Sequence, residues 1–165
     1  MQITNPSASF VRPANTTAYA TIGLLVANST TAGSVVPMSF NLGNSFAVGQ
    51  FRLTRARVFK TGTAVTGADF RLMLYENLPV PANGDGAAWS TDNAAHWLGN
   101  IDITSMLAFT DGAAGTGSCV AGSEMMIRMY QGKIIYGLLT KLTATNWTPA
   151  SGETITVVLE ELDSY

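Results

Sequence analysis

The longest alternating run in the chain is Phe51-Arg52-Leu53-Thr54-Arg55-Ala56-Arg57-Val58-Phe59-Lys60. A period of two residues is typical of a β-strand, because successive side chains point to opposite faces of a sheet. Each face of this strand carries both apolar and basic residues, so neither face is predicted to belong wholly to the core. Similar but shorter runs extend through the sequence on both sides of it.

These shorter runs are separated by turn-forming residues, and no helical period is sustained over ten residues. We predict further strands at 19–27, 35–41, 70–76, 97–104, 124–130, 134–144 and 154–162. Eight or nine short strands with turns between them are typical of an all-β antiparallel sandwich or barrel. The connections are long and unequal, which favours a β-sandwich of the jelly-roll type over an up-and-down barrel.

Three of the segments between the predicted strands are of interest. Residues 77–96 form a long loop rich in proline, asparagine and glycine, and loops of this length are usually functional or partly disordered. Residues 111–122 are small and glycine-rich, which predicts an exposed connection. Residues 105–109 can add a helical turn.

The N-terminal segment is polar and contains Pro6 and Pro13, each of which disfavours helix at the residue before it. We therefore predict an extended N-terminal arm at residues 1–17, with a short strand near Phe10. One β-sandwich domain is predicted to follow at 18–165.

The chain carries few groups with which to do chemistry. Only 12% of its 165 residues are charged, about half the roughly 25% usual for globular domains. It has one histidine and one cysteine, whereas catalysis at neutral pH usually draws on converging His, Cys, Lys and carboxylate side chains. The composition predicts a scaffold or binding protein that is not an enzyme, with no cofactor and no metal.

Charge and hydropathy also restrict the partners. The net charge of −2 gives no reason to expect nucleic acid or an anionic membrane. No stretch approaches the roughly 20 apolar residues of a membrane span. The first residues lack the basic and apolar regions of a signal peptide, which predicts synthesis in the cytoplasm.

The acidic residues give no catalytic pattern. A polysaccharide-degrading enzyme needs two acids facing each other across a cleft, and nothing in the spacing of Glu76, Asp85 and Asp102 brings them together. The segment Asn83-Gly84-Asp85-Gly86 favours a plain turn over a calcium loop, because the EF-hand spacing of acids is absent. His96 has only Asp92 and Asp102 nearby in sequence, which favours an ordinary surface or boundary residue.

Basic residues are concentrated in the alternating strand, at Arg52, Arg55, Arg57 and Lys60. A nucleic-acid surface would need a net positive charge and interleaved exposed aromatics. We expect these residues instead to pair with acids, within the sheet or on a neighbouring subunit. Candidate acids are Glu160, Glu161 and Asp163.

The three tryptophans suggest a second possibility. Trp97 falls in a predicted strand and is expected in the core, whereas Trp89 and Trp147 fall in loops and are expected to be exposed. Exposed tryptophans could form a sugar-stacking platform, and they would serve a protein interface equally well.

The beginning of the chain, Asn5-Pro6-Ser7-Ala8-Ser9-Phe10 and then Arg12-Pro13-Ala14-Asn15-Thr16-Thr17-Ala18-Tyr19, resembles a family of tailed-bacteriophage structural proteins. Members of this family are small head-decoration, or cement, proteins, typically encoded beside the major capsid protein. Similar pieces continue through the chain at 33–37, 70–72, 111–115, 135–139 and 148–153. None of these pieces is a catalytic motif.

The resemblance implies a virion protein on the capsid exterior, made in the host bacterial cytoplasm. It would bind the major capsid protein, stabilise the shell without catalysis and assemble as a homo-oligomer, most simply a trimer. The alternative is a carbohydrate- or receptor-binding appendage of the head or tail. The residues expected to contact a partner are Phe10, Arg12, Arg52, Arg55, Arg57, Trp89 and Trp147.

Overall fold

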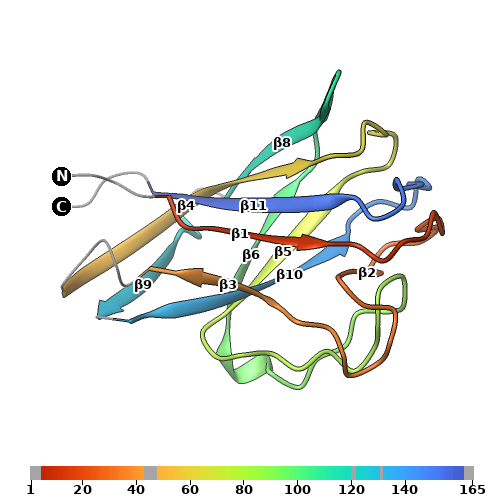
Figure 1. Cartoon of the computed structure of the whole chain (residues 1–165). Coiled ribbons are helices and arrows are strands. Elements are labelled where there is room, and N and C mark those ends of the chain that lie inside the picture. The colour runs from red at the N-terminus through yellow and green to blue at the C-terminus, as the bar shows by residue number, and fades with distance from the viewer. Residues whose placement is uncertain (1–4, 43–47, 120–121, 131, 162–165) are drawn as a thin grey trace.

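In the computed structural model, two antiparallel sheets pack face to face as a β-sandwich (Figure 1). The model describes residues 5–42, 48–119, 122–130 and 132–161. The predicted all-β class and sandwich architecture are confirmed. No helix in the described part of the chain is long and apolar enough to cross a membrane.

The first sheet has the strand order β1-β11-β4-β8-β7, and β9 pairs with the first half of β4. Its strands are β1 (Ser7–Val11), β4 (Val48–Lys60), β7 (Met106–Phe109), β8 (Gly112–Ser118), β9 (Met125–Tyr130) and β11 (Thr154–Glu161).

The second sheet has the order β2-β10-β5-β6, with β3 pairing alongside β10 as well. Its strands are β2 (Leu25–Val26), β3 (Met38–Asn41), β5 (Phe70–Tyr75), β6 (Trp97–Ile103) and β10 (Ile134–Lys141). A single short 3-10 turn in the described residues, η1 (Ala94–His96), precedes β6. Figure 1 shows β1 and β11 side by side in one layer and β3 and β10 in the other.

A bulge in β4 explains why its two faces looked mixed in the sequence. Leu53 is buried, and the inward positions that follow are Ala56, Val58 and Lys60. The inward side therefore changes from odd to even residue numbers within the strand. The change coincides with a register shift against β11 between Glu160 and Glu161, which is the two-against-one pairing of a β-bulge.

The second sheet is covered on its inner face and on part of its outer face. Its inner face packs against the first sheet in the main core, while a smaller apolar cluster lies on its outer face around Leu25, Val35, Tyr75 and Leu138. Strands buried on both faces read as nearly continuous apolar runs, as β10 does. The long segment 77–96 contributes Trp89 to this outer cluster.

Two sequence predictions are wrong in the region before β9. Residues 106–109 form strand β7 instead of a helical turn, and residues 112–118 form strand β8 instead of an exposed connection. The glycines that suggested a loop are needed for packing. A Cβ at Gly117 would overlap the Asp102 carbonyl of β6, so glycine lets the two sheets approach closely here.

The predicted long strand at 19–27 is also shorter than expected. Only Leu25–Val26 forms a strand, and Ile22 is exposed. By contrast, the predicted short strand near Phe10 is confirmed as β1, which pairs with β11 over its whole length.

Candidate functional site

A group of buried polar side chains lies at one end of the sandwich; we call it the buried polar cluster. Arg12 donates to the Tyr19 hydroxyl (2.8 Å) and forms an ion pair with Asp85 (3.0 Å). Tyr19 donates to the other Asp85 oxygen (2.5 Å), which also accepts from the backbone N–H of Ala27 (2.8 Å). The side chains of Arg12 and Asp85 are almost completely hidden from solvent.

The same cluster contains a second ion pair beside Trp147. Lys60 Nζ lies 3.9 Å from Glu153 Oε1, and both side chains are fully buried. Lys60 also donates to the Gly62 carbonyl (2.7 Å) and lies 5.5 Å from the Trp147 ring centre. Burial lowers the pKa of Lys60, and the Glu153 carboxylate opposes that change.

Trp147 lies close to the cations of both ion pairs. Its ring stacks on Tyr19 at 4.9 Å and meets Phe70 edge-on at 5.0 Å. The expectation that Trp147 is exposed is therefore wrong, because its connection folds over the end of the sandwich. Arg12 and Trp147 are both interior residues in the folded chain, so the cluster supports the fold and leaves partner contacts to other residues.

Tyr19 gives a testable consequence of this burial. Burial, and then the neighbouring Asp85 carboxylate, raise the pKa of the phenol well above its usual value. A folded-state pKa above the unfolded one contributes stability that is fully present below about pH 10 and is lost as the pH rises further, by about 1.4 kcal/mol per pH unit. The stability advantage of the wild type over Tyr19→Phe should therefore shrink between about pH 10 and pH 11.

The measurement is urea unfolding of both proteins at about pH 8, 10 and 11. Because Tyr75 and the lysines are common to both proteins, their titration cancels in the difference. A difference that stays constant from pH 8 to pH 11 would contradict the proposed environment of Tyr19.

The outer face of the first sheet is the second feature with functional potential. Strand pairing places Thr156 opposite Phe59, Phe59 opposite Ala114, and Ala114 opposite Leu107. Residues paired in this way point to the same side of a sheet. A row of mainly apolar and uncharged side chains therefore crosses the face from β11 to β7.

Large apolar side chains on this face are exposed to solvent. Leu107 is 67% exposed, Phe109 55% and Phe59 37%, while Val11 at the β1 edge is 56% exposed. Scattered apolar residues are normal on protein surfaces, but residues gathered on one face indicate an interaction site.

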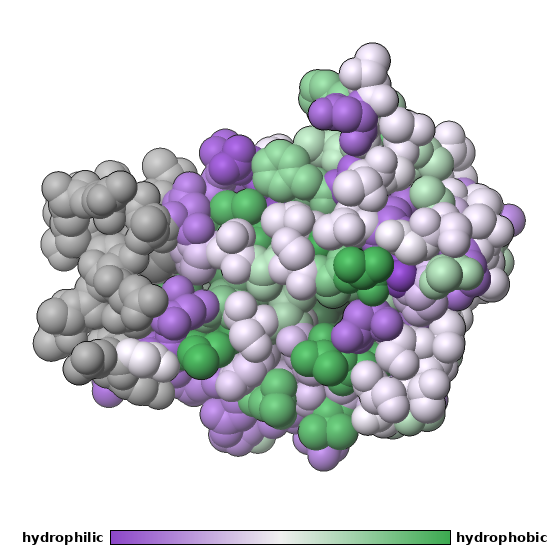
Figure 2. All heavy atoms as spheres, in the orientation of Figure 1, coloured by the Kyte–Doolittle hydropathy of each residue, from purple (hydrophilic) through white to green (hydrophobic). Residues whose placement is uncertain are grey.

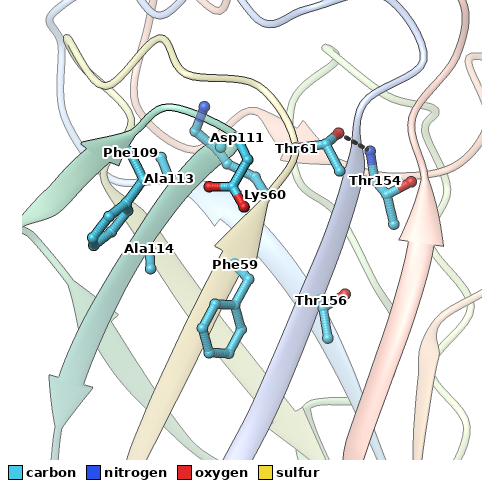
Figure 3. A pocket seen from close by; sticks show the side chains of 10 residues that line it. Phe59, Lys60, Thr61, Phe109, Asp111, Ala113, Ala114, Thr154 and Thr156 are labelled. Carbon is cyan, nitrogen blue, oxygen red and sulfur yellow. Dashed lines mark hydrogen bonds between the residues drawn. The ribbon is translucent and has the colours of Figure 1, made fainter.

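Figure 3 shows how a groove forms on this face. Phe59 on β4 and Phe109 on β7 flank Ala114 on the strand between them, and the small alanine leaves a hollow of about 350 Å³. Thr154 and Thr156 extend the groove towards β11, and Asp111 lies beside Lys60 between Phe109 and Thr154. The groove holds two aromatic rings and hydroxyl groups, which suits contact with another protein surface.

A charged area borders the apolar part of the face. Arg55 and Arg57 both form ion pairs with Glu160, and the Arg57 guanidinium lies 5.4 Å from the Phe59 ring centre. Arg52 pairs with Glu124 at 3.5 Å. The predicted pairing of this basic group with acids is confirmed for Glu160, while the structure does not describe the side chain of Glu161 or any part of Asp163.

The remaining predicted residues lie elsewhere. Phe10 is half-buried and packs against the main core. Trp89 is half-buried over the second sheet, where it lines a pocket together with Trp97. Trp97 is 48% exposed, so its expected place in the core is wrong: it begins edge strand β6 on the outer side.

Sequence reasoning missed Leu107 and Phe109, because residues 105–109 did not show enough alternation to indicate a strand. The signal that could have found them is their neighbour Gly112–Ser118, had its alternating glycines been recognised as a strand.

Other parts of the surface offer less. On the side shown in Figure 2, apolar side chains are scattered among weakly and strongly polar ones. His96 is exposed, and the described residues contain no group of three or more His, Cys, Asp or Glu side chains placed to hold a metal. Comparison with protein-family models and with curated protein sequences gives no match for this chain.

Proposed function

We propose that this chain is a non-enzymatic virion structural protein that binds the outer capsid surface of a tailed phage and stabilises the shell. Two observations support the proposal: the sequence pieces that resemble head-decoration proteins, and the exposed face of the first sheet. The major capsid protein would be the partner, and the protein would be located on the capsid exterior. Many modest contacts repeated over a symmetric shell add up through multivalency.

The outer face of the first sheet carries the proposal. Its apolar row and its groove provide a binding area, and Arg55 and Arg57 at its border provide charged contacts. Partner surfaces typically combine an apolar centre with a polar rim. The ion pairs with Glu160 hold the two arginines in place before any partner binds.

The proposal includes a jelly-roll connection of the sandwich. The strand orders β1-β11-β4-β8 and β3-β10-β5-β6 support it, because the chain repeatedly crosses between the two sheets. Jelly rolls are common in viral proteins, although a fold alone does not establish a function. A homotrimer remains part of the proposal, on the resemblance alone.

The first experiment is to count copies of this chain in purified virions by quantitative mass spectrometry, relative to the major capsid protein. A number in the hundreds and in simple ratio to the capsid protein is the expected result. A few to a few dozen copies would place the protein at the tail or a vertex and would contradict shell decoration.

Substitution on the face gives the matching prediction. Leu107→Glu should weaken co-sedimentation with capsid shells at least about tenfold, because a charge placed in a buried apolar contact costs more than about 1.4 kcal/mol. The thermal unfolding midpoint should change little, since Leu107 is exposed in the free chain.

Leu78→Glu is the matched control, because Leu78 is similarly exposed but lies in the 77–96 segment away from this face. Equal shell binding by Leu107→Glu and the wild type, or loss only with Leu78→Glu, would show that the outer face of the first sheet is not the docking surface.

A further inference from the structure

The outer face of the second sheet carries a separate pocket of about 230 Å³. Its floor comes from strands, with Met73 and Tyr75 on β5 and Trp97 on β6. Its wall comes from Trp89, Thr91 and Ala94 in the 77–96 segment. Sequence alone places these residues in two distant groups, and the structure brings them together.

The pocket is built on ordered backbone. Tyr75 pairs directly with Trp97 across β5 and β6, which fixes the floor. The backbone N–H of Trp89 donates to the Gly23 carbonyl (2.8 Å), and an isolated β-bridge joins Thr91 to Pro81. Side chains in the wall can therefore adjust on a backbone that is already positioned.

The pocket has an apolar lining with a few neutral polar atoms. The Tyr75 hydroxyl, the Trp89 indole nitrogen and the Thr91 hydroxyl are all buried, and none makes a hydrogen bond of good geometry, although the Tyr75 and Trp89 groups interact with each other. Most buried polar atoms in proteins have a well-placed partner, so these three atoms beside one pocket leave hydrogen-bonding capacity for a ligand or water. Burial raises the pKa of Tyr75 to about 12, and the interaction with Trp89 opposes this change, so the phenol stays neutral near pH 7.

We propose that this pocket binds one ring of a neutral saccharide. The exposed Trp97 indole offers a flat apolar surface for the C–H face of a sugar ring, and the ring hydroxyls would supply partners for the buried polar atoms of Tyr75, Trp89 and Thr91. Because these atoms are buried, the proposal requires the half-buried Trp89 side chain to rotate when the ligand binds. A binding pocket with mainly apolar walls and a few placed polar groups is the usual form of a small-molecule site.

The lining also restricts the ligand. None of its six residues is charged, so an acidic or phosphorylated sugar would bury its charge without a partner. The volume lies below the roughly 300–1,000 Å³ of sites for drug-sized molecules, which fits one ring. A proline ring of a peptide would also stack on Trp97, but it carries no hydroxyl groups for the buried polar atoms of Tyr75, Trp89 and Thr91.

The pocket and the groove of Figure 3 lie on the outer faces of different sheets. Both can therefore be occupied at once, and a shell bound to the first sheet would leave the pocket open to solvent. Saccharide binding does not depend on shell binding, so each proposal can fail without the other.

The test is an NMR titration of the full chain, following the indole N–H signals of its tryptophans. The probes are the methyl glycosides of glucose, galactose, mannose, rhamnose, fucose, N-acetylglucosamine and N-acetylgalactosamine, with N-acetylneuraminic acid as the charged comparison. We expect saturable shifts of Trp89 and Trp97 with at least one neutral glycoside and none with the charged sugar. Trp147, which is fully buried at the end of the sandwich, serves as an internal reference.

Two variants locate the binding. Trp97→Ala should weaken it at least about tenfold by removing the stacking surface. Thr91→Val, which removes one hydroxyl at nearly constant shape, should weaken it roughly two- to tenfold without changing the unfolding midpoint. Leu78→Ala is the exposed control in the same segment and should bind as the wild type does.

Failure of every neutral glycoside to give a saturable shift up to its solubility limit would overturn the proposal. So would binding that survives Trp97→Ala unchanged, or tight binding of a proline-rich peptide to this pocket in place of any sugar.

Discussion

Replacing Asp85 with alanine is expected to lower the free energy of unfolding by about 3–5 kcal/mol, the usual effect of breaking a buried ion pair from one side. Asp85 accepts hydrogen bonds from Arg12, Tyr19 and the backbone of Ala27. Its loss leaves the Arg12 guanidinium buried without a counter-charge. For a chain of this size the unfolding midpoint should fall by roughly 6–20 °C, which calorimetry can measure.

Asp92→Ala is the matched control, because Asp92 is exposed in the same 77–96 segment, and its substitution should change stability by no more than about 0.5 kcal/mol. The double variant Arg12→Met with Asp85→Leu should recover much of the loss, since an apolar pair of similar volume replaces both charges. A loss below about 1 kcal/mol for Asp85→Ala would mean that Arg12 has another source of compensation.

The cluster around Asp85 shows why part of this structure was beyond sequence reasoning. The sequence around Asp85 predicts a turn, and the residue does lie in one, but its partners Arg12 and Tyr19 are 73 and 66 positions away. No local pattern indicates which distant cation a turn aspartate will meet. Such partners can be identified only from the three-dimensional structure, in which the connections at one end of the sandwich lie next to each other.

Local patterns did predict the class of the fold. Alternation indicated most of the strands in both sheets, and the basic residues of β4 were correctly expected to find an acid in the last strand, as Arg55 and Arg57 do with Glu160. The bulge in β4 was not predictable from that alternation. The bulge shifts the inward-facing positions by one residue. Read as one uninterrupted strand, the sequence therefore shows apolar and basic residues on both faces.

The candidate sites were harder to predict than the strands. The exposed face depends on Leu107 and Phe109, whose strand β7 is only four residues long, and the sequence of this segment predicts a helical turn. The pocket depends on Trp89 and Trp97. The sequence predicts Trp89 to be exposed because it falls in a loop, and Trp97 to be buried because it falls in a strand. An edge strand exposes residues on its outer side, which is why Trp97 is accessible although it lies in a strand.

Glycine in β8 leads to the second large effect. Gly117→Ala is expected to lower the free energy of unfolding by about 3 kcal/mol, at the upper end of the range for overpacking. The added Cβ would overlap the Asp102 carbonyl of β6, which is backbone and cannot rotate away. The two sheets would have to separate at this edge, and the melting midpoint should fall accordingly.

Two neighbours in the same strand make the comparison decisive. A Cβ at Gly115 would meet mainly the end of the flexible Met106 side chain, so Gly115→Ala should cost less than Gly117→Ala. Thr116 is exposed on the outer face, so Thr116→Ala should change stability by about 0.5 kcal/mol or less. If all three variants had the same unfolding midpoint, close approach of β8 to β6 would not be the reason for glycine at position 117. The strand would then tolerate side chains on both faces.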